Sequence, residues 1–195
     1  DKLNKIYLNQ VLRCSSAFIG CSENACKSLF GSKNKSSVIY NAYDDKKYTY
    51  QDFGRHDGDT MLIVQVGRYD ATKNQLFSLK VVKELLAKGI RVRLVLIGSD
   101  QGIEEKKLRT EARKLGIEGN IEYLETDTDI LSWLSIADIF LFPSLSEGFG
   151  TALIEAQAVG VKCYASDSIP YETNCGGCRY ISLEEGPDRW AEIIE

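Results

Sequence analysis

The chain has 195 residues, of which 44% are hydrophobic and 27% charged, and its formal net charge is −4 with a pI of about 5.2. This length allows one full hydrophobic core, or one domain with part of another. The acidic balance argues against a nucleic-acid binder, and no apolar run approaches the ~18 residues of a membrane span.

The cysteines raise the question of disulfide bonds or zinc; they are Cys14, Cys21, Cys26, Cys163, Cys175 and Cys178. Cys175 and Cys178 have metal-like spacing, but Cys21 and Cys26, their candidate partners, are spaced too widely for a zinc pair. Several cysteines lie in apolar stretches, where a free thiol behaves as a small hydrophobic side chain. We therefore expect free thiols in a reducing cytoplasm and no bound metal.

The first part of the chain shows short elements. Ser22 precedes a helical pattern that ends at Gly31, and a serine at that place satisfies free backbone N–H groups. A loose helical pattern and two apolar runs complete this part, at residues 1–12, 16–21 and 36–40. Residues 45–59 are polar and aperiodic, which predicts a linker between residues 1–44 and residues 60–195.

Strands and helices alternate regularly after the linker. The predicted strands are 61–66, 92–97, 121–124, 139–142 and 162–165, and the predicted helices are 74–87, 103–115, 130–136, 151–159 and 187–194. Strands without polar alternation are buried on both faces, which is typical of a parallel sheet. We therefore predict a doubly wound, Rossmann-like parallel α/β sheet with helices on both faces.

Such sheets bind ligands at the carboxyl ends of their strands. The turns that we expect to share one crevice are Gly67-Arg68, Gly98-Ser99-Asp100, Leu124-Glu125 and Pro143 to Gly150. Arg68 and Lys73 near the first turn form a candidate clamp for a diphosphate. The last turn leads into a helix whose free N–H groups favour an anion.

Glu147 and Glu155 bracket that helix start, and carboxylates accept hydrogen bonds from the hydroxyl pairs of a ribose or hexose. Two cations and two carboxylates together predict a nucleotide-sugar pocket. The alternatives are two solvated surface cations and an ordinary strand-to-helix turn with two solvated glutamates.

One combination of motifs runs through this crevice: Gly67-Arg68 with Lys73, Pro143-Ser144, and Glu147-Gly148-Phe149-Gly150 followed by Glu155. With weaker matches from Cys21-Ser22-Glu23 onward, the whole chain resembles the retaining glycosyltransferases of the GT-B fold, family 4. The stretch from Ser166 to Ala191 is similar to the exopolysaccharide and capsule branch. The resemblance implies the C-terminal, donor-binding half of such an enzyme, which moves a hexose to a saccharide or lipid-linked acceptor.

The resemblance also implies roles for individual residues. Arg68 and Lys73 hold the donor diphosphate, and with Glu147 they form the catalytic group. The transferred sugar contacts Glu147, Gly148, Phe149 and Gly150, and the amides of Thr151 and Ala152 face phosphate. Glu155 takes the ribose hydroxyls. The base lies near Leu124 and Glu125, although the family often has glycine at the position of Glu125 and base identity is therefore open.

By the same resemblance, residues 1–44 are the last elements of the N-terminal acceptor domain. The rest of that domain, with its catalytic histidine, is absent, and His56 is expected to be a solvated loop residue. We therefore expect this chain to bind a nucleotide sugar, with a UDP-sugar favoured over a GDP-sugar, and to transfer sugar poorly by itself. The expected location is cytoplasmic, with any membrane contact made through the absent domain.

Two Asp-x-Asp sequences imitate a metal motif of another glycosyltransferase fold. Asp127-Thr128-Asp129 precedes a helix and is interpreted as its N-cap and charged first turn, and Asp57-Gly58-Asp59 lies in a loop. Two other functions stay open: a nucleotide-binding module without catalysis, and another GT-B enzyme such as a nucleotide-sugar epimerase.

Overall fold

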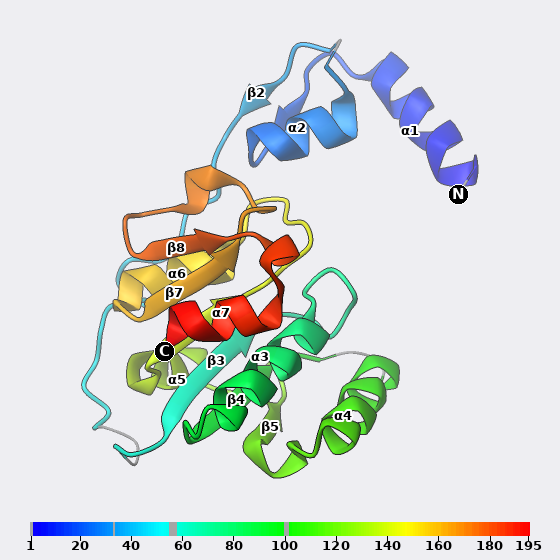
Figure 1. Ribbon diagram of the computed structural model, residues 1–195. Helices are drawn as coiled ribbons and strands as arrows, with labels where there is room; N and C mark the ends of the chain where they lie inside the picture. The colour runs from blue at the N-terminus through cyan, green and yellow to red at the C-terminus, as the bar shows by residue number, and fades with distance from the viewer. Residues whose placement is uncertain (1, 33, 55–57, 100–101) are drawn as a thin grey trace. The chain divides into compact units, whose positions relative to one another are not determined.

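The computed structural model describes residues 2–32, 34–54, 58–99 and 102–195, drawn as a ribbon in Figure 1. The chain divides into two compact units, Asp1–Ala42 and Tyr43–Glu195. The described residues of the segment expected as a linker, 45–54 and 58–59, are counted with the second unit.

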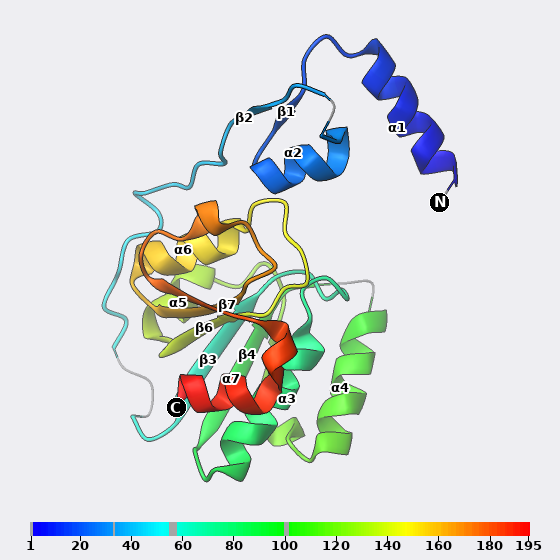
Figure 2. The same ribbon diagram turned by 45° about the horizontal axis from the view of Figure 1, so that its top comes forward.

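The first unit contains α1 (Lys2–Cys14), β1 (Ile19–Gly20), α2 (Glu23–Phe30) and β2 (Ser37–Val38). The two strands pair in parallel and lie side by side in Figure 2. The Ser22 hydroxyl oxygen accepts a hydrogen bond from the Ala25 N–H at 3.0 Å, and α2 ends at Gly31, whose φ is 72°. The predicted start and end of this helix are confirmed.

The second unit is built on a sheet of six parallel strands in the described part of the chain, in the order β5-β4-β3-β6-β7-β8. The strands are β3 (Met61–Val66), β4 (Val92–Ile97), β5 (Ile121–Leu124), β6 (Ile139–Phe142), β7 (Lys162–Ser166) and β8 (Cys178–Ile181). The chain winds outward in one direction from β3 to β5 and in the other from β6 to β8. The predicted doubly wound parallel sheet is confirmed, and its order reverses between β3 and β6.

Helices cover both faces of this sheet, as Figures 1 and 2 show. They are α3 (Gln75–Ala87), α4 (Ile103–Leu115), α5 (Ile130–Ile136), α6 (Thr151–Val159) and α7 (Gly186–Ile194), with short 3₁₀ turns at Glu118–Asn120, Tyr171–Thr173 and Leu183–Glu185. Along β3, Ile63 enters the core beneath α3, α4 and α7, whereas Leu62 and Val64 enter the core beneath α5 and α6. Apart from Gln65 the strand is apolar, because both of its faces are buried.

Strand β8 was not predicted from the sequence. It is an edge strand paired only with β7 among the described strands, and its charged Arg179 is exposed. Its first residue, Cys178, lies opposite Cys163 of β7. All six cysteines are free thiols, and burial raises the pKa of Cys178 to about 12, so this thiol stays protonated at neutral pH.

Tyr48 is the unexpected member of the core. It lies in the segment expected as a linker, yet its side chain is only 8% exposed and packs into the core beneath α5 and α6. A single buried ring in a polar stretch has no period, so no pattern in the sequence indicated it.

Within the described residues, the structure has no helix of the length and hydrophobicity that crossing a membrane requires.

Candidate functional site

The candidate site lies where the strand order reverses. β3 and β6 pair through Ile63 with Ile139 and Val64 with Phe140, which leaves the last two residues of each strand outside the β3–β6 ladder. The loops that follow the two strands contact each other. The Leu145 N–H donates to the Thr72 carbonyl at 2.8 Å.

The other predicted turns meet at the same edge. The Gly67 N–H donates to the Ile97 carbonyl and the Gly98 N–H to the Leu124 carbonyl, both at 2.9 Å. The buried Tyr69 hydroxyl donates to the Leu96 carbonyl at 2.9 Å and contacts the Leu124 carbonyl at 3.3 Å, and burial raises the pKa of this tyrosine. The structure therefore brings the four turns together, although Asp100 lies outside the described residues.

Lys73 and Glu147 form the centre of this crevice. The Lys73 Nζ lies 2.7 Å from the Glu147 Oε1, and the two side chains are only 19% and 10% exposed. The ammonium group also lies 5.3 Å from the centre of the Phe142 ring. Sequence reasoning assigned these residues to different parts of a ligand and did not predict that they contact each other.

Arg68 is placed differently from its expected partner Lys73. Its side chain is 81% exposed, and its guanidinium lies 3.6 Å from an Asp70 carboxylate oxygen. The other Asp70 oxygen accepts hydrogen bonds from the N–H groups of Thr72 and Lys73, at 2.9 and 3.0 Å. Asp70 therefore shapes the turn, and Arg68 extends from it into solvent.

Buried amides that sequence reasoning missed hold the backbone of the turn from Arg68 to Lys73. Gln65 donates to the Lys73 carbonyl at 2.8 Å and accepts from the Ser78 hydroxyl at 2.7 Å. Gln75 donates to the Arg68 carbonyl at 2.8 Å. The feature of the sequence that could have indicated these amides is Gln65, a polar residue inside an otherwise apolar strand. A buried amide there requires partners, and the Lys73 carbonyl and the Ser78 hydroxyl of α3 supply them.

The loop after β6 is held on both sides. Asn74 donates to the Pro143 carbonyl at 3.1 Å, and the Ser166 hydroxyl of β7 donates to the Ser144 carbonyl. The loop ends at Gly150, which precedes α6 in the left-handed region with a φ of 94°. A glycine cap brings no side chain to the first N–H groups of the helix, so the amides of Thr151 and Ala152 are available to an anion.

Glu155 lies one turn further along α6 and is only partly buried. Burial raises the pKa of its carboxyl group, opposed by a hydrogen bond from the Tyr48 hydroxyl and by the charge of Lys47. Tyr48 therefore contacts a residue that the sequence placed in the site. At the other end of the crevice, Leu124 is half-buried and Glu125 is exposed.

The Glu155 environment predicts a pH-dependent effect on stability. When folding raises the pKa of a carboxyl group, the contribution of that group to stability is fully present at pH values below its unfolded pKa of about 4.5. This contribution is lost as the pH rises through the higher pKa of the folded state. We therefore expect Glu155→Gln to raise the free energy of unfolding at pH 7.5 and to leave it nearly unchanged at pH 4, as measured by urea titration. The exposed Glu172→Gln is the control, and equal pH profiles for wild type and Glu155→Gln would contradict the prediction.

The described part of the second Asp-x-Asp sequence lies at the amino end of β3, where Asp59 pairs with Arg91. Asp129 occupies the N-cap position of α5, but its carboxylate accepts a hydrogen bond from the Ser132 hydroxyl and not from a backbone N–H. The expected capping bond is therefore absent from this described helix. His56 and Asp57 lie outside the described residues.

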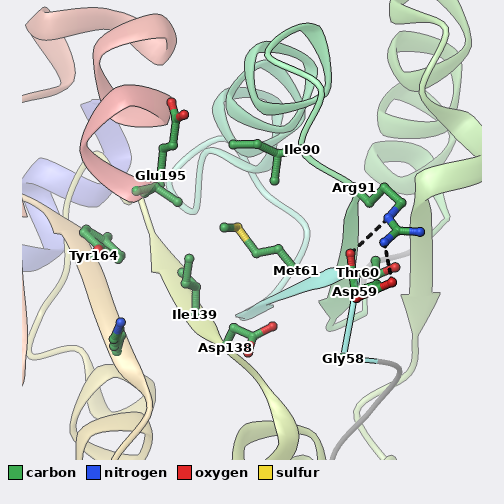
Figure 3. A pocket seen from close by; sticks show the side chains of 12 residues that line it. Gly58, Asp59, Thr60, Met61, Ile90, Arg91, Asp138, Ile139, Tyr164 and Glu195 are labelled. Atoms are coloured by element: carbon green, nitrogen blue, oxygen red, sulfur yellow. Dashed lines mark hydrogen bonds and ion pairs between the residues drawn. The ribbon is translucent and has the colours of Figure 1, made fainter.

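A separate cavity of about 350 Å³ opens at the opposite edge of the sheet (Figure 3). It lies at the amino ends of β3, β6 and β7 and is lined by residues such as Met61, Ile139 and Tyr164. The Arg91 guanidinium closes one side through its ion pair with Asp59 at 2.7 Å. Ligands of doubly wound sheets bind at the carboxyl ends of the strands, so this cavity is not the candidate site.

The sheet, with a mostly buried ion pair and a glycine-capped helix start at its switch point, is that of a doubly wound α/β domain. The profile of the family described as "Glycosyl transferases group 1" matches residues 47–174, and the chain belongs to this family.

The relatives agree with this assignment. The chain is 30% identical to the "Putative glycosyltransferase EpsF" of Bacillus subtilis (strain 168), over 97% of this chain and 52% of that protein. It is 34% identical to the "Capsular polysaccharide biosynthesis glycosyltransferase CapH" of Staphylococcus aureus, over 66% of this chain and 35% of that protein. The chain thus spans about half the length, or less, of these curated relatives.

Solved structures share the fold. Anabaena Alr3699/HepE in complex with UDP and glucose matches with a TM-score of 0.81 and 19% identity, over 97% of this chain and 55% of that one. Sucrose-phosphate synthase from Thermosynechococcus elongatus matches with a TM-score of 0.78 and 19% identity, over 100% of this chain and 55% of that one. The sheet and its helices therefore share the Rossmann-like α/β fold of these GT-B neighbours.

Proposed function

We propose that this chain is the donor-binding half of a retaining glycosyltransferase of family 4, which moves a hexose from a nucleotide diphosphate sugar to a saccharide or lipid-linked acceptor. The observation that carries the proposal is the Lys73–Glu147 pair, a cation for phosphate and a carboxylate for hydroxyls, held together at the switch point. The name of CapH supports a role in bacterial surface polysaccharide synthesis, and the complexes of HepE with UDP and with UDP-glucose support a UDP-sugar donor.

Each part of the donor has a chemically suitable partner in the crevice or, for Arg68, at its exposed rim. Arg68 and Lys73 neutralise the diphosphate, and the charge that develops on this leaving group in the transition state makes them catalytic. The N–H groups at the start of α6 add to that field. Glu147 accepts hydrogen bonds from the transferred sugar and Glu155 from the ribose hydroxyls, which places the base near Leu124 and Glu125.

The acceptor and the remaining catalytic groups belong to the other half of the enzyme in this proposal. Because this chain spans about half the length of its relatives, we expect it to bind a donor without efficient transfer. We further propose a cytoplasmic location, with any membrane contact made by the other half. Measurable turnover of a saccharide or lipid-linked acceptor by this chain alone would contradict the division of labour.

Calorimetry with UDP, GDP, ADP and their sugars tests the proposal directly. We expect UDP and UDP-glucose to bind, and Glu155→Ala to weaken both about tenfold, because both ligands carry the ribose diol that this carboxylate accepts from. The exposed Glu172→Ala is the control for loss of one negative charge. If no nucleotide or nucleotide sugar binds to the folded wild-type chain, the donor-binding role is wrong.

A further inference from the structure

The contact between Lys73 and Glu147 has a consequence for ligand selection. Their charged atoms lie 2.7 Å apart, and both side chains are mostly buried, so the pair is shielded from the solvent that weakens exposed ion pairs. In the unliganded chain, the cation expected to meet phosphate already has an anionic partner.

The pair is held by its surroundings. The Lys73 side chain runs across Gly67, where a Cβ atom would lie 3.1 Å from its Cδ and Cε atoms, and the Lys73 carbonyl is fixed by Gln65. Glu147 lies in the loop between β6 and α6, beside Gly150. Arg68 is the contrast, since it is exposed and its carboxylate contact is longer, at 3.6 Å.

We propose that Glu147 is an internal competitor for the donor diphosphate, which holds Lys73 in the empty site and releases it fully only to a ligand whose sugar hydroxyls satisfy the carboxylate in exchange. This inference rests on the donor-binding function proposed above and deepens it. Glu147 is thereby a specificity residue that favours binding of the nucleotide sugar over binding of the free nucleoside diphosphate. The free nucleoside diphosphate is also the product of transfer.

The physical reason is the cost of a mostly buried carboxylate without a partner. A free diphosphate that forms an ion pair with Lys73 leaves Glu147 without a cationic partner and beside a second anion. This arrangement is unfavourable where the carboxylate is largely shielded from solvent. A sugar diphosphate brings hydroxyl donors to the same carboxylate, and hydrogen bonds to an ionised acceptor are strong. The penalty therefore falls on the ligand without a sugar.

The test measures inorganic pyrophosphate, UDP and UDP-glucose by calorimetry on the 195-residue chain, comparing wild type with Glu147→Gln and Glu147→Asp. We expect Glu147→Gln, which keeps the shape and removes the charge, to bind pyrophosphate and UDP roughly tenfold more tightly. It should bind UDP-glucose no more tightly than wild type, so the preference for the sugar ligand falls. Glu147→Asp withdraws the carboxylate from Lys73 and should give a smaller tightening for pyrophosphate.

Controls separate this mechanism from a general change in charge. Glu172→Gln removes an exposed charge elsewhere and should alter no affinity, and in a Lys73→Met background the tightening by Glu147→Gln should disappear. Thermal unfolding of each variant establishes that it is folded. If Glu147→Gln does not fold, Glu147→Asp replaces it as the test variant.

The outcomes distinguish the two proposals. If wild type binds UDP but folded Glu147→Gln binds pyrophosphate and UDP no more tightly, the internal competitor is wrong and donor binding stands. If wild type binds no nucleotide, donor binding is wrong, and tighter pyrophosphate binding by Glu147→Gln still supports the competition at Lys73. If neither protein binds pyrophosphate, the inference is overturned.

Discussion

Lys73→Met is expected to lower the free energy of unfolding by about 3 kcal/mol and to weaken UDP binding by about a hundredfold or more. Methionine keeps most of the packing over Gly67, so the change isolates the charge. The loss of stability arises because Glu147, only 10% exposed, is left as an uncompensated carboxylate. The expected cost lies at the low end for a broken buried pair because both side chains keep some exposure.

Urea titration and calorimetry measure the two effects of Lys73→Met. The exposed Lys80→Met of α3 is the matched control and should change neither quantity. Because replacing both partners of a buried pair avoids the unpaired charge, adding Glu147→Gln to Lys73→Met should restore most of the stability but not the UDP affinity. If the single variant is as stable as wild type, the pair is not a structural element of the crevice.

Gly98→Ala is expected to destabilise the second unit by about 3 kcal/mol. A Cβ atom on Gly98 would overlap the Gly67 carbonyl oxygen, and the carbon of that carbonyl would lie only 2.9 Å away. Both are backbone atoms at the carboxyl end of β3, so neither can turn aside as a flexible side chain could. The displaced Gly67 also begins the turn that carries Lys73, and UDP affinity should therefore fall together with stability.

Gly119→Ala is the control for Gly98→Ala, because a Cβ atom at Gly119 meets nothing within 4 Å. It should change the urea midpoint by little, whereas Gly98→Ala should lower it clearly. A Gly98→Ala protein with wild-type stability would show that the two turns can separate without cost.

The elements of the second unit were largely predictable. Five of its strands and five helices have the predicted bounds to within one residue, since buried parallel strands are continuous apolar runs and glycine follows α3, α4 and α6 within two residues. β8 was missed because a short edge strand with an exposed arginine lacks that pattern. The turns at Gly67 and at Pro143 to Gly150 were also placed correctly at one edge, because parallel strands have their carboxyl ends together.

The sequence by itself determined the fold class, the strand ends and the residue types that stand after them, because hydrophobic periodicity and glycine positions are local properties. Only the tertiary structure decided which of those side chains contact each other. Lys73 and Glu147 are 74 positions apart in sequence, and their contact depends on the order of the strands and on the exact separation of β3 from β6. The same holds for Tyr48 and Glu155, whose interaction depends on a polar segment folding back onto α6. No local sequence pattern predicts such a long-range contact, because packing between distant parts of the chain creates it.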